Sequence, residues 1–362
     1  MKTLRNLMMV LVMAVGAAAS AANDRDIVQN VARKVILQTY LDLAARAKEM
    51  QAKIEVLNQQ RTQENLAAVQ QAWRDARVSW EQSESFLFGP VDALGLDPAI
   101  DTWPLNRLDL QAVLKSNRAL TVDFVRNLGA NLQGFHTIEF LIFGDGINTN
   151  QKPIATLTDR EVEYLRATSG LLVEKTGQLA NAWLRNADPD DSSVPGFVEI
   201  ISNPGLENAF YPSNQAVLVE YTKGIIAILD EVANGKMSDP LGADIGSANI
   251  ALVESPFSWN SLADFTDNIR SVLNVYTGDY GTTEGPGLID AVAKKNGALA
   301  TRVEARIRQA MQKIMDVGGS EAMDYRHAIQ DVPARARAQA AIKDLNELRA
   351  IFENEVLPVI EQ

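Results

Sequence analysis

The segment GFHTIEFLIFG, residues 134–144, carries one of the two histidines in the sequence. His136 and Glu139 are three positions apart, so on an α-helix both side chains project from one face and can reach a single ion. Imidazole and carboxylate ligands suit zinc, iron or manganese. The apolar residues around the pair indicate a mostly buried helix, in which polar groups need partners. Spacing alone therefore leaves two alternatives, a metal site and an internal hydrogen bond.

Three further residues could belong to such a site. Gly134 has no side chain, so another backbone or a ligand can approach the helix closely there. In AWRDARVSWEQSESF, residues 72–86, Arg77 and Glu84 are seven positions apart. Seven positions are two helical turns, so both charges are expected on one face, as part of a pocket or as a salt-bridged outer surface.

A third group of polar residues occupies residues 254–278. Ser258 or Asn260 is predicted to cap a helix that begins near Leu262, because both residue types accept hydrogen bonds from a first helical turn. Asn268 is a polar residue on an otherwise packed element, and capping does not explain it. The second histidine, His327, has no carboxylate three or four positions after it, which favours a helix-surface role.

Composition and missing motifs exclude several function classes. The sequence has no cysteine, so any metal must be held by imidazole and oxygen ligands. Neither HExxH nor GxSxG occurs, so a conventional hydrolase signature is absent. A formal net charge of −12 makes nucleic acid an unsuitable partner and a cation an easier one to accommodate.

Residues 1–22 have the three-part pattern of a cleavable signal peptide. Lys2 and Arg5 precede an apolar stretch from Leu7 to Val15, and small residues follow at 19–22. The apolar stretch is too short to span a bilayer as a mature helix. Without cysteine the protein is not a lipoprotein. The sequence therefore predicts a periplasmic protein with no transmembrane segment in its mature chain, with secretion as the alternative.

Apolar residues recur at helical spacing in nearly every long segment, which predicts an all-α fold. Examples of these periodic positions are Leu299, Val303, Ile307, Met311 and Ile314. Proline and glycine predict loops at 89–104 and at 186–212. We expect two helical-bundle domains packed side by side, at 23–190 and 213–362, joined by a linker at 191–212.

The sequence resembles the imelysin family. Gly134, His136 and Glu139 match its GxHxxE signature, and further segments appear in family order. These segments are AWRDARVSWEQSESFLFGP, DTWPLNR, GKMSDP and ESPFSWNSLADFTDNIRSVLNVYTG. The resemblance implies an exported protein of two helical bundles with a functional site at their interface, a link to iron, and a label of metallopeptidase.

The resemblance also implies roles for individual residues. His136 and Glu139 are the expected metal ligands, and Glu84 is the candidate for a third. The expected pocket residues around these ligands are Gly134, Arg77, Trp103, Ser255 and Ser258. We add Asn268 to this pocket as the polar residue that capping leaves unexplained.

We expect an exported metal-binding protein that serves iron acquisition or handling. Its cofactor would be a divalent or ferric ion, with iron preferred and zinc as the alternative. Its partners would be the metal ion and other iron-uptake components of the cell envelope. Two other functions stay open at this point: a metallopeptidase that uses the same HxxE site, and an interaction protein that holds a ligand in its cleft without metal.

Overall fold

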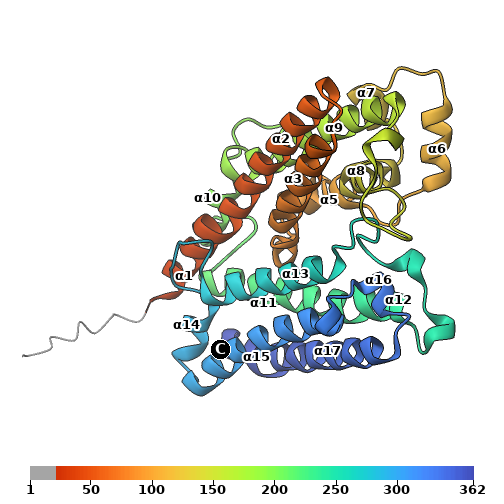
Figure 1. Cartoon of the computed structure of the whole chain (residues 1–362). Coiled ribbons are helices and arrows are strands. Elements are labelled where there is room, and N and C mark those ends of the chain that lie inside the picture. Colours follow the sequence, from red (N-terminus) through yellow and green to blue (C-terminus); the bar gives the residue numbers. More distant parts are fainter. Residues whose placement is uncertain (1–21) are drawn as a thin grey trace, which may run out of the picture.

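The computed structural model describes residues 22–362, and it is built from helices joined by loops (Figure 1). Within this range there is no β-strand, only an isolated bridge between Tyr280 and Thr283. The predicted all-α fold class is therefore confirmed. No helix in this range is both long and apolar enough to cross a bilayer. Residues 1–21, which hold nearly all of the predicted signal peptide, lie outside the described residues.

The N-terminal helices form one group, drawn in red to yellow-green in Figure 1. Its long members are α2 (Leu37–Gln59), α3 (Gln63–Glu81), α8 (Gly134–Phe143) and α9 (Asp159–Leu184). Helix α1 (Asp24–Asn30) runs into α2 through a π-helical segment, η1 (Val31–Ile36). Short elements connect α3 to α8: η2 (Glu84–Phe86), α4 (Pro90–Ala93), α5 (Asp97–Asp101), α6 (Arg107–Lys115), α7 (Val122–Arg126) and η3 (Ala130–Leu132).

The C-terminal helices form a second group beside the first (Figure 1). Its long members are α11 (Asn214–Asp230), α13 (Ser261–Thr277), α15 (Gly297–Met315) and α17 (Val332–Ile351). A π-helical segment, η5 (Glu231–Met237), joins α11 to α12 (Ser238–Leu241). The short helices of this group are α14 (Leu288–Ala293), α16 (Tyr325–Ala328) and α18 (Leu357–Ile360), and η9 (Phe352–Val356) precedes the last. Helix α10 (Phe197–Ser202), which comes before them in sequence, packs on α1, η1 and α9 of the first group (Figure 1).

The periodic apolar positions form the core. On α15, Leu299, Val303, Ile307, Met311 and Ile314 are all buried, as their spacing predicts. The buried apolar residues of both helix groups form one continuous cluster. Helix α3 packs on α13, and η2 packs on α11, so the two groups share an extensive contact. The division into two domains with a boundary at 191–212 stays a prediction.

The predicted loop at 89–104 contains two helices, α4 and α5, so that expectation was wrong in part. Pro90 begins α4, and Pro98 lies in the first turn of α5. Proline is compatible with a first turn because its missing N–H has no partner within the helix there. The difference matters because Asp101, the last residue of α5, reaches the candidate site.

Candidate metal centre

Gly134 brings the end of α5 against the start of α8. Its φ angle is +69°, a conformation that favours glycine, and a Cβ atom there would lie 2.1 Å from the carbonyl oxygen of Ile100. The backbone that approaches Gly134 is thus that of α5. This close contact places Asp101 beside His136, which follows on the first turn of α8.

His136 is buried between two carboxylates. Its Nδ1 atom lies 3.0 Å from Oε2 of Glu139, and its Nε2 atom lies 3.2 Å from Oδ1 of Asp101. Burial lowers the pKa of His136, but the charge of Asp101 and the hydrogen bond to Glu139 outweigh it and raise the pKa to about 9. The ring therefore carries a proton on both nitrogens at neutral pH until another cation replaces one of them.

Glu139 ties α8 to the loop before α13. Its Oε1 atom accepts hydrogen bonds from the backbone N–H of Phe257 at 3.0 Å, and from the N–H and hydroxyl of Ser258, both at 2.7 Å. Ser255 and Trp259 have φ angles of 48° and 62°, so left-handed residues flank the two donors. Both oxygens of Glu139 are thus engaged by protein donors. Ser258 holds this carboxylate and does not cap α13, which Asn260 precedes without a side-chain cap.

Arg77 is the buried cation at the back of the site. Its guanidinium donates to Asp101 at 2.5 Å and to Glu254 at 3.2 Å, and it also contacts Glu81 and Asp264. Burial lowers the pKa of Arg77, but the surrounding carboxylates, led by Asp101, raise it well above its usual value. Glu81 is the last residue of α3, four positions after Arg77, and the two side chains form an ion pair. The expectation that Arg77 and Glu84 share one helical face was wrong, because Glu84 lies on η2 beyond the helix end.

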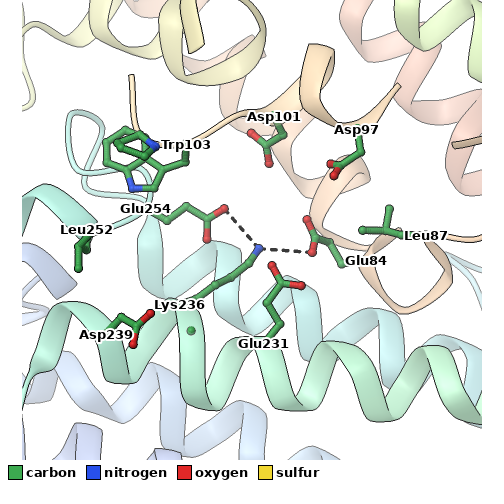
Figure 2. A pocket seen from close by; sticks show the side chains of 12 residues that line it. Glu84, Leu87, Asp97, Asp101, Trp103, Glu231, Lys236, Asp239, Leu252 and Glu254 are labelled. Atoms are coloured by element: carbon green, nitrogen blue, oxygen red, sulfur yellow. Dashed lines mark hydrogen bonds and ion pairs between the residues drawn. The ribbon is translucent and has the colours of Figure 1, made fainter. Parts of the chain in front are cut away.

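A cavity of about 380 Å³ opens in front of these residues, between the two helix groups (Figure 2). Its wall contains acidic side chains from both groups, with one lysine among them and apolar residues at its sides. The lining residues are Glu84, Leu87, Asp97, Asp101, Trp103, Pro104, Glu231, Gly235, Lys236, Asp239, Leu252 and Glu254. The Trp103 ring also meets the His136 ring edge to face, with 4.8 Å between centroids. His136 lies directly behind the wall.

Burial disfavours the charged form of three carboxyl groups in or beside the cavity, whereas at Asp101 the effect of burial is outweighed by Arg77 and His136, which hold its pKa well below its usual value. Burial raises the pKa of Glu84 to about 8 against the opposing effect of Lys236, and nearby acidic groups add to the rise. Burial, then the charge of Asp101, raises the pKa of Asp97 to about 6. Burial also raises the pKa of Glu81 well above its usual value. Because so many carboxyl groups face one another, a bound cation would relieve their mutual repulsion.

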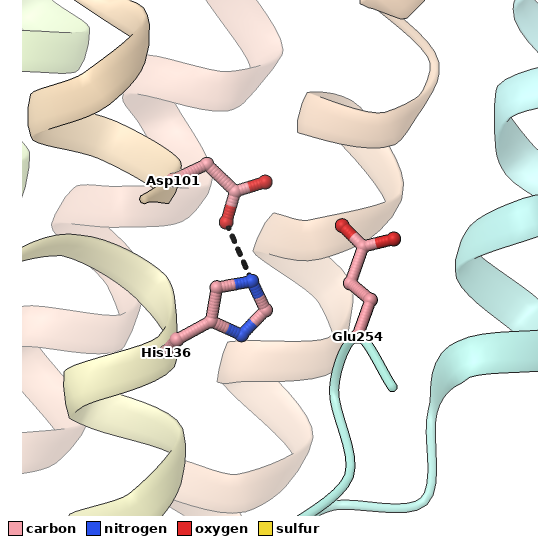
Figure 3. A group of neighbouring side chains, drawn as sticks. All are labelled: Asp101, His136 and Glu254. Carbon is pink, nitrogen blue, oxygen red and sulfur yellow. Dashed lines mark ion pairs between the residues drawn. The ribbon is translucent and has the colours of Figure 1, made fainter. Parts of the chain in front are cut away.

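Two sets of three side chains can offer ligand atoms within 4.8 Å of one another. The first set is Asp101, His136 and Glu254 (Figure 3). The second is Glu81, Glu84 and Asp101, so Asp101 belongs to both. Oε2 of Glu254 is buried and has no hydrogen-bond partner among residues 22–362, and Nε2 of His136 has the Asp101 contact at 3.2 Å without a well-aligned hydrogen bond. Buried polar atoms without a partner are costly, so the first set fits a nitrogen- and oxygen-binding metal ion.

The chain matches one family over most of its length. The family model for imelysin, peptidase family M75, matches residues 36–352. The chain belongs to the imelysin family. Iron-regulated protein A from Synechococcus elongatus is 29% identical over 338 residues, which cover 92% of this chain and 86% of the relative.

Solved structures agree with this imelysin assignment. A crystal structure from Parabacteroides distasonis, of a candidate iron-regulated protein A precursor, has a TM-score of 0.79 and 25% identity, covering 96% of each chain. The crystal structure of an imelysin-like protein from Psychrobacter arcticum has a TM-score of 0.72 at 15% identity, covering 94% of this chain and 96% of that one. The second likeness shows a shared fold.

Most of the site residues that the imelysin resemblance predicts lie in one region of the structure, but only some of them line the cavity. Glu84 and Trp103 line the cavity, whereas Arg77 and His136 lie behind its wall. Gly134, Ser255 and Ser258 shape the contacts that hold Asp101 and Glu139. Asn268 does not line the cavity, and its side chain donates to Oε2 of Glu81 at 2.5 Å.

Sequence reasoning missed three residues that complete the site: Asp101, Lys236 and Glu254. Each stands inside a segment that carries the family resemblance, DTWPLNR, GKMSDP and ESPFSWNS respectively. The charged residues inside the segments that match the family were therefore the signal in the sequence that could have identified these site residues.

Proposed function

We propose that this imelysin binds a transition-metal ion through Asp101, His136 and Glu254, and serves iron acquisition or handling. The observation that carries the proposal is the buried Nε2 atom of His136, which faces the carboxylates of Asp101 and Glu254 and, among residues 22–362, forms no well-aligned hydrogen bond. A neutral imidazole nitrogen with two carboxylate oxygens suits ferrous, ferric or zinc ions. In this proposal the ion is cargo, and iron is preferred because a relative is named for iron regulation.

Glu139 acts in this proposal as the group that positions His136 and not as a ligand. Metal-binding histidines commonly donate their second N–H to a carboxylate, which fixes the ring and its tautomer. Oε2 of Glu139 is placed to accept this N–H, and three donors from Phe257 and Ser258 hold its other oxygen. Glu84 lies in the second set of carboxylates, beside the proposed ion.

The proposal includes export to the periplasm, which rests on the leader pattern of residues 1–22. There the protein would meet metal ions that enter the cell envelope and pass them to other iron-uptake components. The acidic cavity is open between the two helix groups, so an ion reaches it without unfolding of a core.

Metal binding by the purified protein tests this function. We expect one ferrous or zinc ion per wild-type chain by calorimetry, and a loss of affinity of at least about 100-fold in Asp101→Asn, His136→Ala and Glu254→Gln. His327→Ala is the matched control, because His327 also contacts a carboxylate three residues away, Asp324, but lies on the surface. Equal binding by His136→Ala and His327→Ala would contradict the proposal. Cleavage of peptides by the metal-loaded wild type, lost in His136→Ala, would favour a metallopeptidase instead.

A further inference from the structure

Lys236 places a positive charge inside the acidic cavity. It lies on η5, the π-helical segment that follows α11, and its side chain is only 11% exposed. Its Nζ atom lies 3.3 Å from Oε1 of Glu254 and 3.4 Å from Oε2 of Glu84 (Figure 2). It also lies 3.6 Å from Oε2 of Glu81. Three carboxyl groups, from α3, from η2 and from the loop before α13, thus converge on one ammonium group.

Two of these carboxylates belong to the second set of potential ligands, Glu81, Glu84 and Asp101. Glu84 is buried, and no side chain or backbone group among residues 22–362 donates a well-formed hydrogen bond to its carboxylate. Its nearest positive charge is the Lys236 ammonium. Oε2 of Glu254, which belongs to the first set, has no hydrogen-bond partner among residues 22–362. The lysine therefore neutralises part of the negative charge of a cluster of acidic side chains, and this cluster is otherwise arranged as a metal site.

We propose that the Lys236 ammonium occupies a second cation position, adjacent to the proposed ion site and sharing Glu254 with it. A lysine ammonium is a compact point charge, so it can stand in for a metal ion among carboxylates. This inference rests on the proposed function. The lysine limits the cavity to one transition-metal ion, where the carboxylates alone would hold two.

The positions of the three charges support this arrangement. Arg77 contacts Asp101, Glu81 and Glu254 from behind the cavity wall. A fixed positive charge therefore already balances these acidic groups on the side away from the cavity. Lys236 reaches Glu84 and Glu254 from the cavity side. An ion at Asp101, His136 and Glu254 would lie beside the ammonium, and repulsion between the two weakens binding of the ion. A binding protein that must pass on its cargo gains a faster release from this repulsion.

The number of bound ions tests the inference. Wild type, Lys236→Met and Lys236→Arg are dialysed against zinc or, without oxygen, ferrous ions, and the metal content per folded chain is measured. We expect one ion in wild type and in Lys236→Arg, and two ions in Lys236→Met. The first ion should also bind at least about tenfold more tightly in Lys236→Met. Lys236→Gln, whose amide can still donate to Glu84 and Glu254, takes the place of Lys236→Met if that variant does not fold.

Lys152→Met is the matched control for loss of a buried lysine. Lys152 pairs with Glu161 at 2.8 Å and with the carbonyl oxygen of Leu141, outside the cavity, so this variant should bind one ion. One ion with unchanged affinity in Lys236→Met and Lys236→Gln overturns the inference and leaves the proposed function standing. No ion in any of these proteins contradicts both.

Discussion

The Nδ1 atom of His136 lies 3.0 Å from Oε2 of Glu139, so the two charged residues of the family signature bind each other. Spacing alone left a shared ion and an internal hydrogen bond as alternatives for this pair. The hydrogen bond leaves Nε2 as the ring atom that faces Asp101 and Glu254. In the proposed centre, the signature thus supplies one ligand together with the group that orients it.

Glu139→Gln should lower metal affinity while preserving the fold. The amide oxygen can still accept from Phe257 and Ser258, but the amide NH₂ then faces Nδ1 of His136. This contact favours the tautomer that carries its proton on Nε2, the proposed ligand atom. We expect a loss of metal affinity of roughly 10- to 100-fold, as for other groups that support a ligand. Calorimetry measures the affinity, and unaltered binding would assign Glu139 no positioning role.

Glu139→Ala should destabilise the protein even without metal. The change leaves the buried N–H groups of Phe257 and Ser258 without an acceptor. Each unsatisfied buried group costs about 1–3 kcal/mol, so the free energy of unfolding should fall by at least about 2 kcal/mol. Urea unfolding in the presence of a chelator measures it. Ser258→Ala removes only the hydroxyl donor and should have a smaller effect.

Gly134→Ala should disturb the contact between α5 and α8. A Cβ atom at this positive φ would collide with the carbonyl oxygen of Ile100. Backbone strain of about 1–2 kcal/mol and overpacking of about 1–3 kcal/mol both lower the free energy of unfolding. Gly177→Ala on α9 is the control, because no neighbouring atom in the described part of the chain lies within 4 Å of its added methyl group, and it should leave stability unchanged or raise it. Similar effects of both changes in chemical denaturation would rule out the close contact.

Arg77→Met should be far more destabilising than loss of a surface arginine. Removal of Arg77 leaves the buried carboxylates of Asp101, Glu81 and Glu254 without their inner cation. Breaking a buried ion pair from one side costs about 3–5 kcal/mol. Arg308→Met breaks an exposed pair with Glu304, which contributes about 1 kcal/mol or less. Thermal and urea unfolding of both variants compare the two losses.

Glu84→Gln should change how stability depends on pH. The pKa of Glu84 in the folded protein, about 8, lies above its usual value because burial disfavours the charged form. The folded state therefore binds a proton that the unfolded state has lost, so metal-free wild type should lose stability as pH rises from about 5 to 9. Glu84→Gln removes this contribution, and its advantage over wild type should grow across the same range. Parallel pH profiles in chelator-treated samples would contradict the raised pKa.

The fold was predictable because its signals are local. Helical spacing of residues such as Leu299 and Val303 reports burial wherever the helix lies, and the structure buries both. The short helices α4 and α5 were missed because their prolines also mark loops, and only the first-turn position separates the two cases.

The candidate site was predictable only where its residues are close in sequence. His136 and Glu139 share one turn of α8, so their spacing was informative. Asp101 reaches His136 only because α5 closes on Gly134, and Glu254 comes from the other helix group. Sequence spacing does not encode such tertiary contacts, nor does it tell which imidazole nitrogen faces which carboxylate.

Because Lys236 lies on the π-helical segment η5, the direction of its side chain depends on the number of residues in that segment as well as on the residue type. A π-helical turn contains one residue more than an α-helical turn, and such turns occur often at functional sites. Deletion of one residue between Glu231 and Lys236 would rotate the lysine by about 100° around the helix axis. The ammonium would then leave Glu84 and Glu254 without any substitution in the cavity wall. A single-codon insertion or deletion is thus an evolutionary route by which the charge of this pocket can be reset.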